Sequence, residues 1–180
     1  MTTQNIIRSC GFILGIAAVI YGGIRVSHQY HANSSFIPAT ARGHQAPNFA
    51  LATPDGKIVR VAEYRGKAVL LNFFGDTCEP CLEESPWLVD IQKRYEAKGF
   101  EVVGIEMYGA SNNAIKNYAK QFNTNYVLVH GNDAIGNEYG IGSFPTSYFL
   151  NANGTIVAAT VGLHSENEME ANVQAALAGE

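Results

Sequence analysis

Residues 70–81 read Leu-Leu-Asn-Phe-Phe-Gly-Asp-Thr-Cys-Glu-Pro-Cys, and this stretch decides the fold. An apolar run of strand length ends at the Gly-Asp pair, and a helical pattern begins with two cysteines that are two residues apart. The stretch therefore predicts a buried strand followed at once by a helix that carries a thiol pair at its N-terminus.

The position of the two thiols indicates their chemistry. Only a thiolate is a nucleophile, and the free N–H groups at a helix N-terminus stabilise negative charge. We therefore expect Cys78 to be an acidic, exposed, attacking thiol. Pro80 suits the first helical turn, where its missing N–H breaks no helical bond. Cys81 lies one turn further in, where its sulfur can resolve a mixed disulfide formed on Cys78.

A carboxylate follows the thiols on the same predicted helix face. Cys81, Glu84, Leu88, Ile91 and Tyr95 are three or four residues apart, and the last three mark this face as buried. Desolvation there should raise the pKa of Glu84, which makes it the candidate proton carrier for Cys81. The alternative is that this carboxylate reaches solvent at the edge of the helix.

Two other readings of the cysteine pair are weaker. A structural zinc ion usually takes four ligands, and the sequence has no second cysteine pair. An inert structural disulfide around two residues would close a very short loop and constrain the chain little. We therefore predict no metal site and no cofactor.

The stretch around the cysteines resembles the active site of the TlpA/ResA-like, membrane-anchored thioredoxin family. The similarity extends from about residue 46 to the C-terminus, with further matches at residues 46–49, 64–67 and 144–146. The resemblance implies a thioredoxin-like thiol–disulfide oxidoreductase in which Cys78 and Cys81 are catalytic. It also implies that Glu84 is the acid–base group and that the bond before Pro145 is cis, with the proline packed against the cysteines.

The same resemblance implies a surface that docks a substrate strand. We expect it to include Thr77, Glu79, Pro80, Phe144, Pro145 and Thr146. Two residues depart from the pattern. Family members usually carry Trp where this chain has Thr77, which changes the contact surface around Cys78. Thioredoxin itself has a buried Asp on the central strand where this chain has Asn72.

The N-terminal part of the chain predicts a membrane anchor. No charged residue occurs between Arg8 and Arg25, so we assign residues 1–26 to a single transmembrane helix, residues 27–45 to a polar linker, and residues 46–180 to the thioredoxin-like domain. The alternative is a cleaved signal peptide, but the small-residue pattern at residues 39–41 lies far beyond the apolar run. We expect the domain to face the extracytoplasmic, periplasmic side of the membrane.

The pattern of the remaining chain predicts an α/β fold with a central mixed sheet and helices on both faces. Two core strands joined by a helix should be parallel, and an Asn-Gly turn should join an antiparallel pair. The expected strands are 68–74, 100–106, 126–129, 146–150 and 155–161, after an N-terminal hairpin; the expected helices begin after residue 77 and at residues 111, 133 and 165.

These features together predict a membrane-anchored reductase of protein disulfides. The resemblance implies a membrane thiol-reductase as electron donor and the haem-site cysteines of apocytochrome c as the best-known substrate class. The net charge of −4 without clustered Lys or Arg argues against nucleic-acid binding. One alternative is a copper chaperone that uses the cysteine pair with a histidine such as His130. The other is a thiol peroxidase, although its usual Pro-x-x-x-Thr-x-x-Cys pattern is absent.

Overall fold

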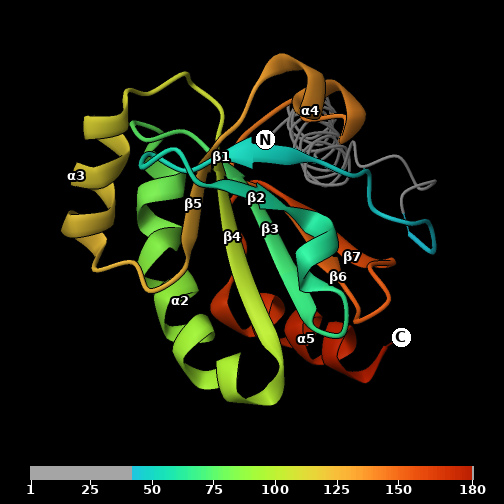
Figure 1. Cartoon of the computed structure of the whole chain (residues 1–180). Helices are drawn as coiled ribbons and strands as arrows, with labels where there is room; N and C mark the ends of the chain where they lie inside the picture. Colours follow the sequence, from blue (N-terminus) through green and yellow to red (C-terminus); the bar gives the residue numbers. More distant parts are fainter. Residues whose placement is uncertain (1–41, 180) are drawn as a thin grey trace, which may run out of the picture. The chain divides into compact units, whose positions relative to one another are not determined.

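The computed structural model describes residues 42–179 of the 180-residue chain (Figure 1). The predicted membrane helix and most of the predicted linker lie outside these residues. Within residues 42–179, no helix is both long enough and apolar enough to cross a bilayer. The elements are β1 (Ala50–Ala52), β2 (Ile58–Arg60), η1 (Val61–Tyr64), β3 (Ala68–Phe74), α2 (Glu79–Tyr95), η2 (Glu96–Lys98), β4 (Phe100–Glu106), α3 (Asn112–Phe122), β5 (Val127–His130), α4 (Asp133–Glu138), β6 (Thr146–Leu150), β7 (Ile156–Val161) and α5 (Glu166–Ala178).

The central sheet has five strands in the order β5-β4-β3-β6-β7, and β1 and β2 form a separate antiparallel pair. Strand β3 is parallel to β4, as predicted for two strands joined by a helix, and β4 is parallel to β5. Strands β6 and β7 join the sheet antiparallel. The mixed sheet is therefore confirmed, with β3 at its centre.

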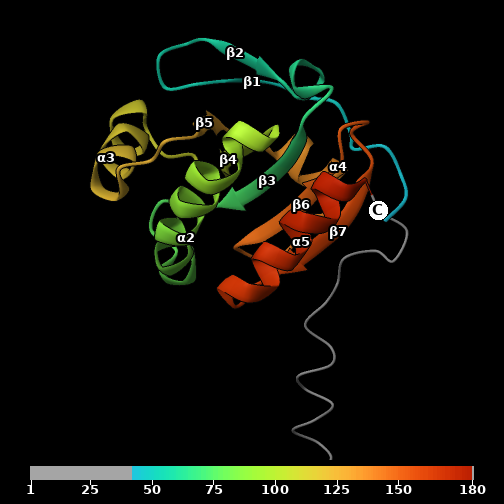
Figure 2. The same ribbon diagram turned by 90° about the horizontal axis from the view of Figure 1, so that it is seen from below.

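Every residue of β3 is buried because both faces of the sheet are covered. Its alternating residues point to opposite sides. Leu70 packs in a cluster with α2 and α5, whereas Leu71 packs with α4 and the β1–β2 hairpin. Figure 2 shows α2 and α5 on one side of the sheet and β1 and β2 on the other. The prediction of helices on both faces is confirmed.

The helix ends follow the sequence signals. The Ser111 hydroxyl oxygen accepts a hydrogen bond from the amide of Ala114, and Ser165 forms a capping box with Glu168. After α2 and η2 the chain turns at Gly99, whose φ of 81° suits a residue without a side chain.

The folded domain includes part of the predicted linker. The amide of Gly43 donates to the carbonyl of Ile156 at 2.8 Å, and the amide of Ile156 donates to the carbonyl of His44 at 2.9 Å. Gln45 forms an isolated antiparallel bridge with Thr155. Residues 43–45 therefore lie along the start of β7, although their polar composition alone assigned them to the linker.

Candidate active site

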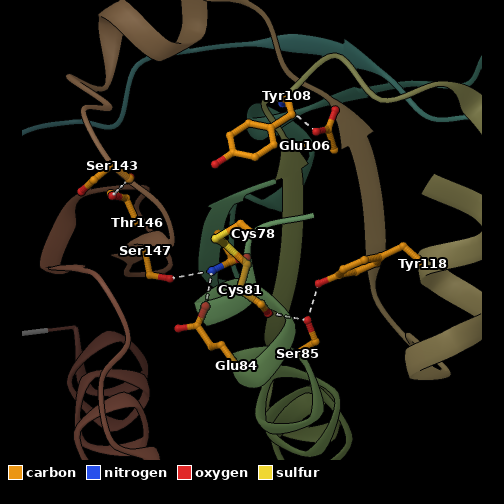
Figure 3. The surroundings of a disulfide bond; sticks show 11 residues. Cys78, Cys81, Glu84, Ser85, Glu106, Tyr108, Tyr118, Ser143, Thr146 and Ser147 are labelled. Carbon is orange, nitrogen blue, oxygen red and sulfur yellow. Dashed lines mark hydrogen bonds between the residues drawn. A yellow bond between two sulfur atoms is a disulfide. The ribbon is translucent and has the colours of Figure 1, made fainter. Parts of the chain in front are cut away.

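The two cysteines lie where β3 ends and α2 begins, at the centre of the sheet. Cys78 is the N-cap residue of α2, and Pro80 lies in the first turn, as predicted. Cys78 and Cys81 form a disulfide with their Cα atoms 5.2 Å apart (Figure 3). The chain is held in this turn by the amide of Cys78, which donates to the carbonyl of Gly75 at 3.2 Å. The helix N-terminus therefore presents its positive end to the sulfur of Cys78.

The outer cysteine is less exposed than we predicted. Cys78 exposes 8% of its surface and Cys81 exposes 2%, so both count as buried, although Cys78 remains the more accessible. Both cysteines belong to an apolar cluster with Phe74, and Phe144 packs against this cluster. Cys78 is therefore the sulfur that solvent can more readily reach, and Cys81 is almost fully enclosed.

Glu84 is buried, which excludes the alternative that it escapes to solvent. It exposes 1% of its surface and lies one turn beyond Cys81 on the same face of α2. Burial raises the pKa of Glu84 from 4.5 to about 7, partly opposed by a hydrogen bond from Asn72. A carboxylate with this pKa gains and loses a proton near neutral pH, so it is suited to general acid–base work.

Asn72 connects Glu84 to strand β6. Its side-chain nitrogen donates to Oε2 of Glu84 at 2.8 Å and to Oγ of Ser147 at 3.0 Å. Asn72 and Ser147 are partners in the register of β3 and β6, and both are buried. The sequence showed that Asn72 lies on the central strand, but the pairing with Ser147 depends on strand register. An uncharged donor leaves Glu84 without a positive partner, so desolvation decides its pKa.

Ser85 and Tyr118 form a second buried polar contact that sequence reasoning missed. Ser85 donates its hydroxyl proton to the carbonyl of Cys81 at 2.7 Å. The Tyr118 hydroxyl is also hydrogen-bonded to Ser85, and it must be the donor because Ser85 has only one proton. Burial raises the pKa of Tyr118, which keeps this donor protonated. The contact ties the second turn of α2 to α3.

The Phe144–Pro145 bond is cis, as the family resemblance implied. It lies directly before β6, whose residue Thr146 pairs with Phe73 near the end of β3, so the proline loop comes next to the cysteine turn. Pro145 is buried, and its carbonyl accepts from the amide of Gly162 at 2.7 Å. Phe144 packs against the cluster that contains both cysteines.

The residues predicted to dock a substrate differ in exposure. Thr77, Glu79 and Pro80 are exposed beside Cys78. Thr146 is 3% exposed, and its hydroxyl donates to the carbonyl of Ser143 at 2.8 Å, so this side chain is directed into the protein. Phe144 is half-buried and remains available at the rim of the site.

Tyr108 and Glu106 are also part of the site, and no pattern in the sequence pointed to either residue. Tyr108 follows β4, and its ring packs edge-to-face against Phe144 with the centroids 5.2 Å apart. Glu106, the last residue of β4, is 1% exposed and accepts hydrogen bonds from the amides of Tyr108 and Ala110. These contacts come from a loop some thirty residues after the cysteines, so sequence spacing could not predict them.

The structure does not bring His130 into the cysteine site. Its Nε2 lies 2.6 Å from Oδ1 of Asn112 at the start of α3. In the part of the chain that the structure describes, no three His, Cys, Asp or Glu side chains are grouped so that they could hold a metal ion. The copper-chaperone alternative therefore has no third ligand among these residues.

The comparisons with known proteins agree with this geometry. The AhpC/TSA family model matches residues 42–159. The thiol-disulfide oxidoreductase ResA of Bacillus subtilis is 31% identical over 139 residues, which cover 77% of each chain. ResA of Bacillus cereus is 30% identical over 133 residues, covering 73% of this chain and 76% of that one.

Solved structures give the same result. A putative thiol:disulfide interchange protein DsbE from Chlorobium tepidum is 29% identical, with a TM-score of 0.70, covering 76% of this chain and 97% of that one. A second thioredoxin-family thiol:disulfide interchange protein from Chlorobium tepidum is 32% identical, with a TM-score of 0.69, covering 76% and 98%. The thioredoxin-like fold is therefore confirmed.

Proposed function

Because this chain belongs to the AhpC/TSA family and is a ResA-like thiol–disulfide oxidoreductase, we propose that it reduces disulfides in other proteins on the outer side of a membrane. The observation that carries the proposal is the Cys78–Cys81 disulfide at the start of α2, with buried Glu84 one turn behind it. The reductive direction is supported by the resemblance to the TlpA/ResA-like family.

The reaction begins with both cysteines reduced. The Cys78 thiolate attacks one sulfur of the substrate disulfide, a bond forms between the two sulfurs, and the other substrate sulfur leaves as a thiolate that takes a proton from solvent. Cys78 is the attacking group because it caps the helix N-terminus and is the more accessible of the two sulfurs.

Resolution of the mixed disulfide requires a second thiolate. Cys81 gives its proton to the Glu84 carboxylate and attacks the sulfur of Cys78, which releases the second substrate sulfur as a thiolate. Two electrons pass from the enzyme to the substrate, and the enzyme is left with the disulfide seen in this structure. A dithiol donor must then reduce it, and we propose a membrane thiol-reductase for this step.

The substrate class that we propose is the haem-site cysteine pair of apocytochrome c. A trapping experiment tests it together with the mechanism. Cys81→Ser protein is mixed with a disulfide-bonded peptide that contains such a cysteine pair, and the products are analysed by mass spectrometry. We expect a stable adduct on Cys78. If no adduct forms, while hydrogen peroxide rapidly oxidises Cys78, the protein is a peroxidase and not a disulfide reductase.

The direction of electron flow has a test of its own. The wild-type protein is equilibrated with glutathione and dithiothreitol mixtures, and the fraction of disulfide is measured by thiol alkylation. A potential at or below that of thioredoxin, about −270 mV, supports a reductase. A potential near that of DsbA, about −120 mV, would make the protein an oxidant.

We also propose that residues 1–26 anchor the enzyme in the membrane with the domain on the extracytoplasmic, periplasmic side. The absence of charge between Arg8 and Arg25 supports this. The full-length chain should stay in the membrane fraction after a carbonate wash. Recovery of a shortened chain in the soluble fraction would instead support a cleaved signal peptide.

A further inference from the structure

Tyr108 is an exposed aromatic residue beside the disulfide, in a position that the mechanism does not use. Among residues 42–179, the large apolar side chains classed as exposed are Ile58, Tyr108 and Leu163, and Tyr108 is the most exposed at 54%. Its ring nevertheless packs against Phe144, with an interplanar angle of 85°. Figure 3 shows this ring at the Cys78 end of the site and not at the Glu84 end.

Gly75 creates the space for this ring. A Cβ atom added at residue 75 would lie 2.5 Å from Cε2 of Tyr108, which is closer than side chains pack. Gly75 belongs to the turn whose carbonyl accepts the amide proton of Cys78. The aromatic ring of Tyr108 therefore lies directly against the backbone that holds the attacking cysteine.

Glu106 fixes the loop from which this ring projects. The amide of Tyr108 donates to Oε1 of Glu106 at 2.6 Å, and the amide of Ala110 donates to Oε2 at 2.9 Å. Glu106 is itself buried at the end of β4. Hydrogen bonds from two backbone amides to one buried carboxylate define the loop conformation, so the ring is held in place before a substrate arrives.

We propose that Tyr108 determines substrate specificity by binding an aromatic or large apolar side chain next to the substrate cysteine. The proposal rests on the proposed disulfide-reductase function, because a substrate must bring its disulfide to Cys78. The residues flanking the substrate cysteine then lie over Phe144 and Tyr108. Together these two rings form an uncharged aromatic surface, and an aromatic side chain gains most from such a contact. Family members usually carry Trp where this chain has Thr77. Tyr108, on a different loop, supplies an aromatic ring beside Cys78 that Thr77 does not.

Two matched peptides test this role in single turnovers of the reduced protein. Each peptide carries one cysteine linked to glutathione by a disulfide, and they differ only at the next residue, which is Phe in one and Ser in the other. The readout is the ratio of the two second-order rate constants. We expect the wild type to prefer the Phe peptide by about five- to tenfold, the size of one aromatic contact.

The following variants distinguish the effect of the Tyr108 ring on the ratio from the effect of its hydroxyl and from nonspecific effects of substitution. Tyr108→Ala should bring the ratio close to one, whereas Tyr108→Phe should keep it because the ring is retained. Ile58→Ala removes another exposed apolar side chain, on β2, and should leave the ratio at the wild-type value. Glu106→Gln should lower the ratio through the position of Tyr108, and should lower it no further when Tyr108→Ala is already present.

The outcomes distinguish this proposal from the proposed function. If the wild type reduces both peptides but the ratio is one, or if Tyr108→Ala keeps the wild-type ratio, the docking role of Tyr108 is wrong and the reductase function stands. If the wild type reduces neither peptide, the reductase function fails and the docking role fails with it.

Discussion

Glu84 and Glu106 are two carboxylates that are equally buried but differently held. Each exposes 1% of its surface, and they lie on neighbouring elements, α2 and β4. Glu106 accepts hydrogen bonds from two backbone amides. Glu84 accepts one from the side chain of Asn72, and burial raises its pKa to about 7. Because both carboxylates are equally buried, they differ in their donors: two backbone amides tie Glu106 to a loop, whereas Glu84 has one uncharged side-chain donor and is the group that we propose as the proton carrier.

The largest expected effect is on the pH dependence of stability. The pKa of Glu84 is about 7 in the folded protein and about 4.5 when it is exposed. Between these values the folded state binds more protons than the unfolded state, so the free energy of unfolding falls as the pH rises. Above about pH 7 the decrease in the free energy of unfolding is complete and amounts to on the order of 3 kcal/mol.

Urea unfolding of the oxidised wild-type domain at pH 5 and pH 8 measures this loss. Glu84→Gln removes the titration and should be the more stable protein of the two at pH 8. Glu83→Gln, an exposed neighbour on the same helix, is the control and should keep the wild-type difference. Equal pH dependence in wild type and Glu84→Gln would show that Glu84 is not the group responsible.

The next largest effect is on resolution of the mixed disulfide. Without the Glu84 carboxylate, Cys81 has no proton acceptor behind it, and loss of a general base costs about 100-fold in rate. Reduced protein is mixed with glutathione disulfide, and the lifetime of the adduct on Cys78 is followed by alkylation and mass spectrometry. The adduct should live about 100-fold longer in Glu84→Gln at pH 7.

The same measurement on Glu106→Gln sharpens the comparison. This variant keeps Glu84, so its adduct should disappear much faster than that of Glu84→Gln. In the wild type the rate of resolution should rise with pH through about 7, as Glu84 becomes the carboxylate that accepts the proton. Equal lifetimes in both variants would remove the distinction between the two buried acids.

A smaller effect is expected in the loop that Glu106 holds. Glutamine offers one acceptor oxygen where the carboxylate offers two, so one of the two loop amides loses its partner, at a cost of about 1–2 kcal/mol. Amide hydrogen exchange at Tyr108 and Ala110 should become at least about tenfold faster in Glu106→Gln. Glu84→Gln should leave both amides protected, and faster exchange there would contradict the separate roles.

The position of Glu84 on a buried face of α2 was predictable from the sequence. The spacing of Cys81, Glu84 and Leu88 placed a carboxylate on a buried helix face, and the structure confirms that face. Helical spacing works here because the chemistry lies within three turns of one helix. The central strand, its parallel partner and the C-terminal hairpin were also predictable, since each depends on local apolar runs and turn residues.

The parts that were not predictable depend on distant contacts. The ring of Tyr108 reaches Gly75 and Phe144 only because the loop after β4 passes the cysteine turn. The pairing of Asn72 with Ser147 needs the register of β3 and β6, and no residue pattern specifies that register. Glu106 is the last residue of a predicted strand, and nothing in the sequence distinguishes it there, because a sequence does not show which amides a carboxylate will bind.

The most direct test of this account is the titration of Glu84 itself. The side-chain carboxyl carbon is labelled with carbon-13, and its chemical shift in the oxidised protein is followed by NMR from pH 3 to pH 10. Asn72→Ala, which removes the donor to Glu84, should titrate still higher. We predict a midpoint of about 7 for the wild type. A midpoint near the ordinary value of 4.5 would contradict it, because the Glu84 carboxylate would then be too weak a base to take the proton of Cys81 effectively at neutral pH.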